Sequence, residues 1–167
     1  MLLRKNSGTI HFKEFKAELS RLLINEDYEI IDIEEYDNMK ARIEANTKNS
    51  ISNGAYRKMQ HIEFTRKKTL NIIINIIGSS YDKSIYMSTG YSDICGIVKI
   101  NNLSSFNTNF NFFDERSGLI VFYDILLQNK MMLDFYEEDD MFFYDIEVFG
   151  NDWIDLIENH GYSISFT

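Results

Sequence analysis

The chain has 167 residues, of which 44% are apolar, and it carries 26 acidic against 17 basic side chains. This composition predicts one globular domain over residues 1–167, and it excludes collagen, a disulfide scaffold and a largely disordered chain. The formal net charge of −9 disfavours direct binding to nucleic acid, because the phosphate backbone would be repelled. A basic protein is the partner that this charge favours.

The compartment is indicated by a single cysteine and by the absence of long apolar runs. Cys95 has no second cysteine with which to form a disulfide, and a free thiol favours a reducing cytoplasm. The first residues lack the apolar stretch of a secretory signal. The longest apolar run, residues 70–77, is far shorter than the roughly 20 residues that a membrane span needs. We therefore expect a cytoplasmic protein with no membrane segment.

Charge is distributed unevenly along the chain. Residues 26–37 contain seven acids and no base, residues 38–70 carry a net charge of +6, and residues 114–167 contain thirteen acids and two bases. Two interpretations stay open. The opposite charges could pair within a solvated surface, with the basic residues between 57 and 68 facing segment 26–37, or the last third could form an acidic recognition face.

An amphipathic helix is predicted near the N-terminus. Apolar residues recur at intervals of three and four from Phe12 to Leu22, and charged residues lie largely off that face. Ser7 or Thr9 could supply the N-cap, because either hydroxyl can accept a hydrogen bond from a backbone amide of the first turn. The apolar stripe is expected to pack in the core.

The middle of the chain predicts mainly strands. Residues 27–47 are ambiguous, strand-like at first and helix-like over 39–45. The polar residues 46–53 predict a loop, and residues 101–111 predict a second one. The isoleucines of residues 70–77 favour a buried strand. Further strands are expected within residues 84–100, at 84–89 and 94–100.

The C-terminal third predicts a meander of three antiparallel strands. Residues 119–127 are apolar on both faces, as in a central strand. A turn at Gln128 and Asn129, with Asn129 in the left-handed conformation, leads to strands over 131–136 and 141–149.

A short helix is expected to follow the meander. Asn151 would cap it, its apolar side would comprise Trp153, Ile154 and Ile157, and Gly161 would end it. Residues 162–166 alternate as a terminal strand would. The fold class is therefore α+β, mainly an antiparallel sheet with a C-terminal meander, an N-terminal amphipathic helix and a short C-terminal helix.

One face of the meander is the candidate binding surface. With Tyr136 opposite Met141, strand alternation assigns apolar residues to one face and a mixture of carboxylates and aromatic rings to the other. Such a mixture is typical of recognition surfaces, where rings supply buried area and charges supply steering. Helices covering this face are the alternative, and only the acidic turn would then be exposed. The residues expected to contact a partner are Asp134, Tyr136, Glu137, Glu138, Asp139, Asp140, Phe143, Asp145 and Glu147.

No motif indicates a reaction. Cys95 lies in an apolar, strand-like setting that favours a buried structural thiol. His11, His61 and His160 are not at metal-ligand spacing, and the acidic turn lacks the pattern of a calcium loop. We therefore predict no catalytic residue, no metal site and no cofactor.

The C-terminal half resembles a known family. The residues that carry the resemblance run from Phe-Phe-Asp-Glu-Arg at 112–116 to Asp-Ile-Glu-Val-Phe-Gly-Asn-Asp-Trp at 145–153. They are similar to bacterial immunity proteins of polymorphic toxin and contact-dependent growth inhibition systems. That resemblance implies a non-covalent inhibitor that covers the active site of a cognate toxin domain, often a basic nuclease. Two other hypotheses stay open: a small enzyme with an unrecognised site, and a phage- or plasmid-encoded acidic adaptor or DNA mimic.

Overall fold

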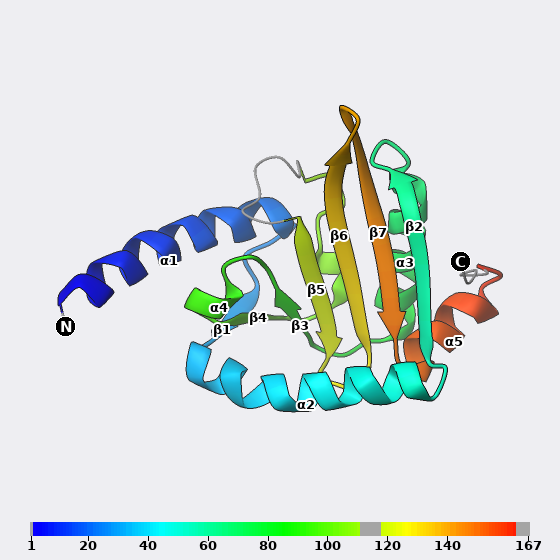
Figure 1. Cartoon of the computed structure of the whole chain (residues 1–167), viewed down its shortest axis with the longest axis horizontal. Helices are drawn as coiled ribbons and strands as arrows, with labels where there is room; N and C mark the ends of the chain where they lie inside the picture. The colour runs from blue at the N-terminus through cyan, green and yellow to red at the C-terminus, as the bar shows by residue number, and fades with distance from the viewer. Residues whose placement is uncertain (1, 111–117, 163–167) are drawn as a thin grey trace.

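The computed structural model describes residues 2–110 and 118–162, in which one antiparallel sheet is flanked by helices (Figure 1). The α+β class predicted from the sequence is confirmed, with a helix before the strands and a short helix after them. The elements within these residues are α1 (Leu2–Leu22), β1 (Tyr28–Ile31), α2 (Ile33–Ser52), β2 (Tyr56–Glu63), α3 (Lys67–Ser80), β3 (Ile85–Ser88), α4 (Ser92–Cys95), β4 (Ile97–Ile100), the 3-10 helix η1 (Leu103–Ser105), β5 (Leu119–Asp124), β6 (Lys130–Glu138), β7 (Met141–Phe149) and α5 (Asn151–Asn159).

The seven described strands are ordered β1-β4-β3-β5-β6-β7-β2. Strand β5 is central, as its apolar residues predict, although it ends at Asp124 rather than at residue 127. The predicted meander is present as β5, β6 and β7. Strand β2 joins its far side by pairing with β7, so a segment from the first half of the chain completes the edge of the meander.

One face of the sheet is fully packed. Helices α3 and α5, η1 and the second half of α1 cover it, and the core between them includes Phe15, Leu19, Leu22, Leu70, Ile73, Ile77, Phe106, Phe122, Leu133, Tyr144, Ile146, Trp153 and Ile157. All thirteen side chains are at least 98% buried. The apolar stripe of α1 and the apolar side of α5 are therefore core, as their spacing predicts.

Of the described helices, α2 lies along the opposite face, and the short α4 meets it near Lys40, which contacts Asp93. The amide of Asn46 donates to the carbonyl oxygen of Leu127 at 2.7 Å, and the guanidinium of Arg42 donates to that of Leu126 at 2.8 Å. These bonds hold α2 against the turn between β5 and β6. Figure 1 shows α2 crossing this end of the strands, and no described helix crosses the other end of β6, β7 and β2 on the same face.

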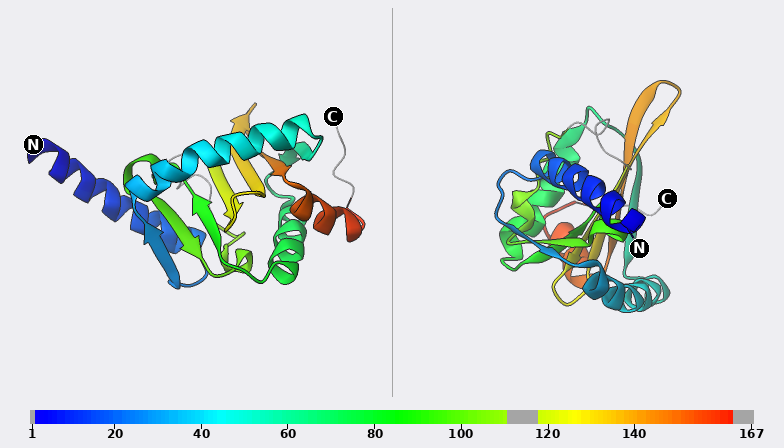
Figure 2. Two further views of the ribbon diagram at one scale, coloured as in Figure 1. Left: turned by 90° about the horizontal axis from the view of Figure 1, so that it is seen from below. Right: turned by 90° about the vertical axis from the view of Figure 1, so that its left-hand side faces the viewer.

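Strands β6 and β7 form a hairpin that projects from the body of the molecule, as the two views of Figure 2 show. Its turn is Asp139-Asp140, with φ of 51° and 61°, the backbone of a type I′ turn. Glu138 pairs with Met141, and Tyr136 pairs with Phe143. The expected pairing of Tyr136 with Met141 is wrong by two residues. Because a shift of two preserves alternation, the two faces of the hairpin are those predicted.

Two predictions in the middle of the chain are wrong. Residues 70–77 are helical, within α3, and not a buried strand. Isoleucine favours strands, but the apolar positions recur at helical spacing, and burial of that stripe outweighs the propensity. Residues 46–53 are not a loop, because all but Asn53 belong to α2. The helix ends at Ser52 with Asn53 as its C-cap, and the next residue, Gly54, has a φ of 73°.

Several predicted boundaries also move. Ser7 and Thr9 lie inside α1 and do not cap it. Residues 94–100 divide between α4 and β4. The predicted strand over 162–166 falls almost wholly outside the described residues. None of the described helices is long and apolar enough to span a lipid bilayer.

Two polar residues near the end of the meander take roles other than those expected. The left-handed residue before β6 is Leu127, with a φ of 59°, and not Asn129. The side chain of Asn129 instead links the turn to Asp124 and Asp152. Asn151 is the first residue of α5 rather than its cap, which is Gly150. A glycine suits that position because its φ is 95°.

Candidate functional site

The nine residues expected to contact a partner all lie on β6, on β7 or in the turn between them. Five of them share the face of the hairpin that points away from the packed core: Asp134, Tyr136, Phe143, Asp145 and Glu147. Tyr136 is paired with Phe143, and Asp134 with Asp145. The clustering that strand alternation predicts is therefore present.

Side chains of β2, which lies beside β7 in the sheet, cover part of this face, which the sequence did not indicate. The register of β2 against β7 shifts between Met59 and Ile62, and His61, within the shift, has a φ of 55°. This bulge turns the imidazole of His61 over the ring of Phe143, with the ring centroids 3.9 Å apart and the planes at 14°. Phe143 is only 3% exposed. The expectation of a bare ring at this position is wrong, because an imidazole lies on it.

Asp145 is also buried, with 8% of its surface exposed. Its Oδ1 accepts from the backbone amide of His61 at 2.8 Å and from the hydroxyl of Tyr136 at 3.0 Å. Its Oδ2 lies 3.2 Å from the ammonium of Lys58. Burial, together with the hydrogen bond to Asp145, raises the pKa of Tyr136 to about 12. The carboxylate of Asp145 is thus satisfied within the molecule and is not free to meet a partner.

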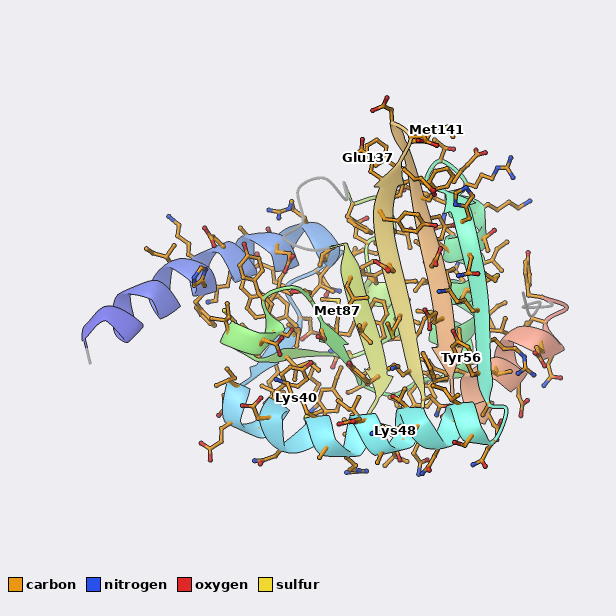
Figure 3. All side chains as sticks on the ribbon, in the orientation of Figure 1. Lys40, Lys48, Tyr56, Met87, Glu137 and Met141 are labelled. Carbon is orange, nitrogen blue, oxygen red and sulfur yellow. The ribbon has the colours of Figure 1, made fainter. Side chains whose placement is uncertain are left out.

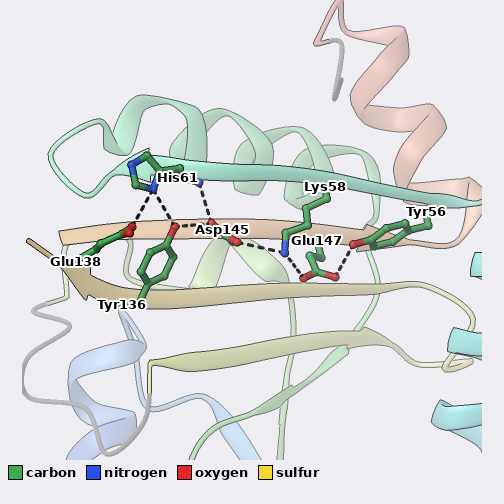
Figure 4. Close-up of polar contacts among 7 residues, drawn as sticks. All are labelled: Tyr56, Lys58, His61, Tyr136, Glu138, Asp145 and Glu147. Carbon is green, nitrogen blue, oxygen red and sulfur yellow. Dashed lines mark hydrogen bonds and ion pairs between the residues drawn. The ribbon is translucent and has the colours of Figure 1, made fainter. Parts of the chain in front are cut away.

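Glu147 continues the same network. Its Oε1 lies 3.1 Å from the ammonium of Lys58, and its Oε2 accepts from the hydroxyl of Tyr56 at 2.9 Å. Burial would lower the pKa of Lys58, but its bonds to Glu147 and Asp145 outweigh that effect and raise it. Figure 4 shows the resulting line of contacts, which we call the polar chain. Its members are Tyr56, Lys58, His61, Tyr136, Glu138, Asp145 and Glu147.

The turn end of the hairpin, unlike the polar chain, is exposed to solvent. The residues Glu137, Glu138, Asp139 and Asp140, which we call the acidic tip, are all exposed. Within the described ranges no lysine or arginine forms an ion pair with any of them, and only the imidazole of His61 approaches, 3.6 Å from Glu138. Met141 is 55% exposed beside them. Figure 3 shows Glu137 and Met141 at the far end of the hairpin.

The basic stretch of the middle segment pairs with acids of the C-terminal third and with its own neighbour. Arg57 lies 2.8 Å from Glu158, and Arg66 lies 3.4 Å from Glu63. Lys58 serves the polar chain, as described above. The idea that this stretch faces the acidic segment 26–37 is therefore wrong for these three residues.

Groups that could carry other chemistry are dispersed. Cys95 is half-buried at the end of α4, not in a strand. His11 faces Glu14 at 3.3 Å, and His160 lies at the end of α5, bonded to the carbonyl oxygen of Leu156. Over residues 2–110 and 118–162, no three His, Cys, Asp or Glu side chains gather as metal ligands would.

Comparisons with protein-family models, with curated proteins and with solved structures find no match to this chain. No relative therefore supplies a function, a ligand or a set of active residues. The geometry of the hairpin is therefore the observation that bears on function. The residues of the polar chain are bonded to one another, whereas the acidic tip has no lysine or arginine partner among the described residues.

Proposed function

We propose that this chain is a protein-binding module of the immunity type, which neutralises a bacterial toxin domain by placing the β6–β7 hairpin in its basic active-site cleft. The observation that carries the proposal is the acidic tip. Four successive carboxylates lie at the end of the β6–β7 hairpin without a lysine or arginine partner among the described residues. A cationic surface would provide the missing counter-charge.

The hairpin suits a cleft better than a flat surface. It is narrow and projects from the body, and its end combines negative charge with the exposed side chain of Met141. The charges would steer encounter with a basic partner and speed association at low salt. The flexible thioether would add apolar contact, because methionine adapts to irregular surfaces.

The polar chain contributes rigidity at the base of the hairpin. Lys58 bridges Asp145 and Glu147, and His61 stacks on Phe143, so β2 is tied to the hairpin by side chains as well as by backbone bonds. A binding arm that is already ordered loses little conformational entropy when it docks. The role inferred for Phe143, Asp145 and Glu147 is thus support of the contact and not the contact itself.

The class of partner comes from charge and from resemblance together. The sequence resemblance of the C-terminal half to immunity proteins, for which the comparisons supply no relative, implies a cognate toxin, often a nuclease with a basic substrate cleft. Carboxylates spaced along a narrow arm can occupy the positions that phosphates would take in such a cleft. A small enzyme and an acidic adaptor or DNA mimic are the other two functions that stay open for this chain.

The test is binding of the toxin domain encoded beside this gene. The chain is expected to inhibit it, with an association rate that falls steeply as salt rises. The variant Glu137→Gln, Glu138→Gln, Asp139→Asn, Asp140→Asn removes the four charges of the acidic tip with little change of size, and asparagine tolerates the left-handed turn. We expect binding to weaken by about 100-fold or more.

A matched control removes four exposed charges elsewhere, by Glu26→Gln, Glu34→Gln, Asp82→Asn and Asp155→Asn. It should bind within about threefold of the unmodified chain, because its charges are remote from the hairpin. Circular dichroism and urea unfolding would verify that both variants are folded. No inhibition by the unmodified chain at low salt, or equal losses in the two variants, would overturn the proposal.

A further inference from the structure

A cavity lies between α2 and the exposed face of β5 and β6, with a volume of about 480 Å³. It is lined by Tyr36, Lys40, Ile43, Glu44, Thr47, Lys48, Tyr123 and Lys130. A second cavity of about 290 Å³ meets it at Tyr36 and Tyr123. The larger volume is in the range of small-molecule sites, and its walls combine aromatic rings, an isoleucine and amines.

Lys130, the first residue of β6, is the unusual member of this lining. Its ammonium lies 4.0 Å from the centroid of the Phe149 ring, and no carboxylate of the described residues lies within ion-pair distance of it. The other two lysines of the cavity differ. Lys40 lies 2.8 Å from both Asp37 and Asp93, and Lys48 lies 2.7 Å from Glu44.

A lysine in these surroundings loses its proton more readily than an exposed lysine. Burial removes water from the ammonium and lowers the pKa of Lys130 to about 8, although the charge of Glu147 acts in the opposite direction. The ring of Phe149 attracts a cation but replaces a carboxylate only weakly. A neutral amine is a nucleophile, whereas an ammonium is not.

We propose that Lys130 is a covalent binding site for small carbonyl compounds, specifically aldehydes with an aromatic body and one acidic substituent. The lone pair of Nζ adds to the carbonyl carbon, and a proton passes from nitrogen to oxygen to give a carbinolamine. Loss of water then forms the imine, and no oxidant or reductant is needed. The aromatic body suits Tyr36, Tyr123 and Ile43, and the acidic substituent would compete with Glu44 for the exposed ammonium of Lys48.

The proposal goes beyond the protein-binding role and does not rest on the hairpin. Its pH dependence involves every element around Lys130. The titratable groups that face this part of the cavity are Tyr36, Lys40, Glu44 and Lys48 of α2, Tyr123 of β5, and Glu147 of β7. Imine formation should rise as the pH passes upward through the titration of Lys130, because only the neutral amine reacts.

The test uses 4-formylbenzoate as the probe, with sodium cyanoborohydride to reduce any imine, and peptide mass spectrometry to locate the label. All eleven lysines of the chain compete in one experiment. At pH 7 about 10% of Lys130 would be neutral, against less than about 0.1% of an ordinary lysine. Lys130 is therefore expected to be labelled at least about tenfold faster than the exposed Lys68. Labelling no faster than that of Lys68 would overturn the proposal.

Two variants separate binding in the cavity from simple reactivity. Lys130→Arg keeps the positive charge and should abolish the fast label while the other lysines react unchanged. Thr47→Leu narrows the cavity and should slow labelling of Lys130 by 4-formylbenzoate but not by formaldehyde, which needs little room. An equal effect on the two aldehydes would show that the cavity plays no part, and would overturn the proposed ligand class.

Discussion

Two lysines on the same side of the sheet have opposite surroundings. Lys58 of β2 contacts two carboxylates, and its pKa is raised although it is largely buried. Lys130 of β6 contacts a phenylalanine ring, and its pKa is lowered. Both flank β7, and they oppose Glu147 and Phe149 there, two residues apart. The comparison shows that burial lowers the pKa of a lysine where no carboxylate bonds it, as for Lys130, and that two bonded carboxylates outweigh burial for the less buried Lys58.

The acids of the hairpin divide in the same way. Asp145 and Glu147 share Lys58, whereas the acidic tip has no lysine or arginine partner among the described residues. Removing one partner of a buried ion pair destabilises a fold because the other charge is left uncompensated, whereas removing an exposed unpaired charge has little effect on stability. The acidic tip, like the exposed Asp134, therefore carries charge that is available for function.

The largest effect is expected from Lys58→Met. It leaves Asp145 and Glu147 largely buried without a cation, so we expect the free energy of unfolding at pH 7 to fall by about 2–3 kcal/mol. Urea denaturation measures it. Adding Asp145→Asn and Glu147→Gln to the same chain should restore at least half of the loss, because the two uncompensated charges are gone. A loss below about 0.5 kcal/mol, as expected for exposed Lys68→Met, would mean that the pairing does not stabilise the fold.

A smaller effect of opposite sign is expected from Lys130→Met. The unfolded chain binds the lysine proton up to a pH near 10.4, whereas the folded chain releases it near 8, so stability rises with pH between these values. Below pH 8 the variant should be more stable by about 1 kcal/mol, after allowance for solvent screening of a partly exposed group. The difference should shrink toward zero by about pH 10.5. Thermal unfolding across this range would reveal a constant difference if the inference were wrong.

The smallest effect concerns the turn of the acidic tip. Both Asp139 and Asp140 have positive φ, and Asn-Gly suits a type I′ turn better than Asp-Asp. Replacing the pair by Asp139→Asn and Asp140→Gly should raise stability by about 0.5 kcal/mol and should leave the rest of the hairpin unchanged. Differential scanning calorimetry would detect the rise in Tm. A fall in Tm would show that these carboxylates stabilise the fold itself.

The sequence predicts the C-terminal third well because local patterns determine it. Alternation along β6 and β7 identifies the two faces of the hairpin, and the spacing of Trp153, Ile154 and Ile157 identifies α5. It fails at residues 70–77, where isoleucine suggests a strand. There Asn71 and Asn75, four residues apart, mark the polar side of a helix, and Leu70, Ile73 and Ile77 mark its buried side.

The candidate site was only partly predictable, for a different reason. The predicted residues of β6 and β7 do share one face. Side chains of β2, which comes much earlier in the chain, cover two of them, Phe143 and Asp145. No local pattern reports that β2 would pair with β7, nor that a bulge at His61 would aim its imidazole at Phe143. The roles of Lys58 and Tyr56 could not be predicted because their partners, Asp145 and Glu147, lie on β7, and no local pattern places β2 beside it. The sequence draws attention to His61 as one of three histidines, but it does not predict that this imidazole stacks on Phe143.

The pairing of β2 with β7 also has a consequence for synthesis on the ribosome. Tyr56–Glu63 leaves the exit tunnel long before Met141–Phe149 has been translated. Until then Lys58 lacks both of its carboxylates, and the edge of β2 has no neighbour. An unpaired strand edge invites pairing with other polypeptides, and a charged side chain such as that of Lys58 disfavours such pairing while β2 waits for β7.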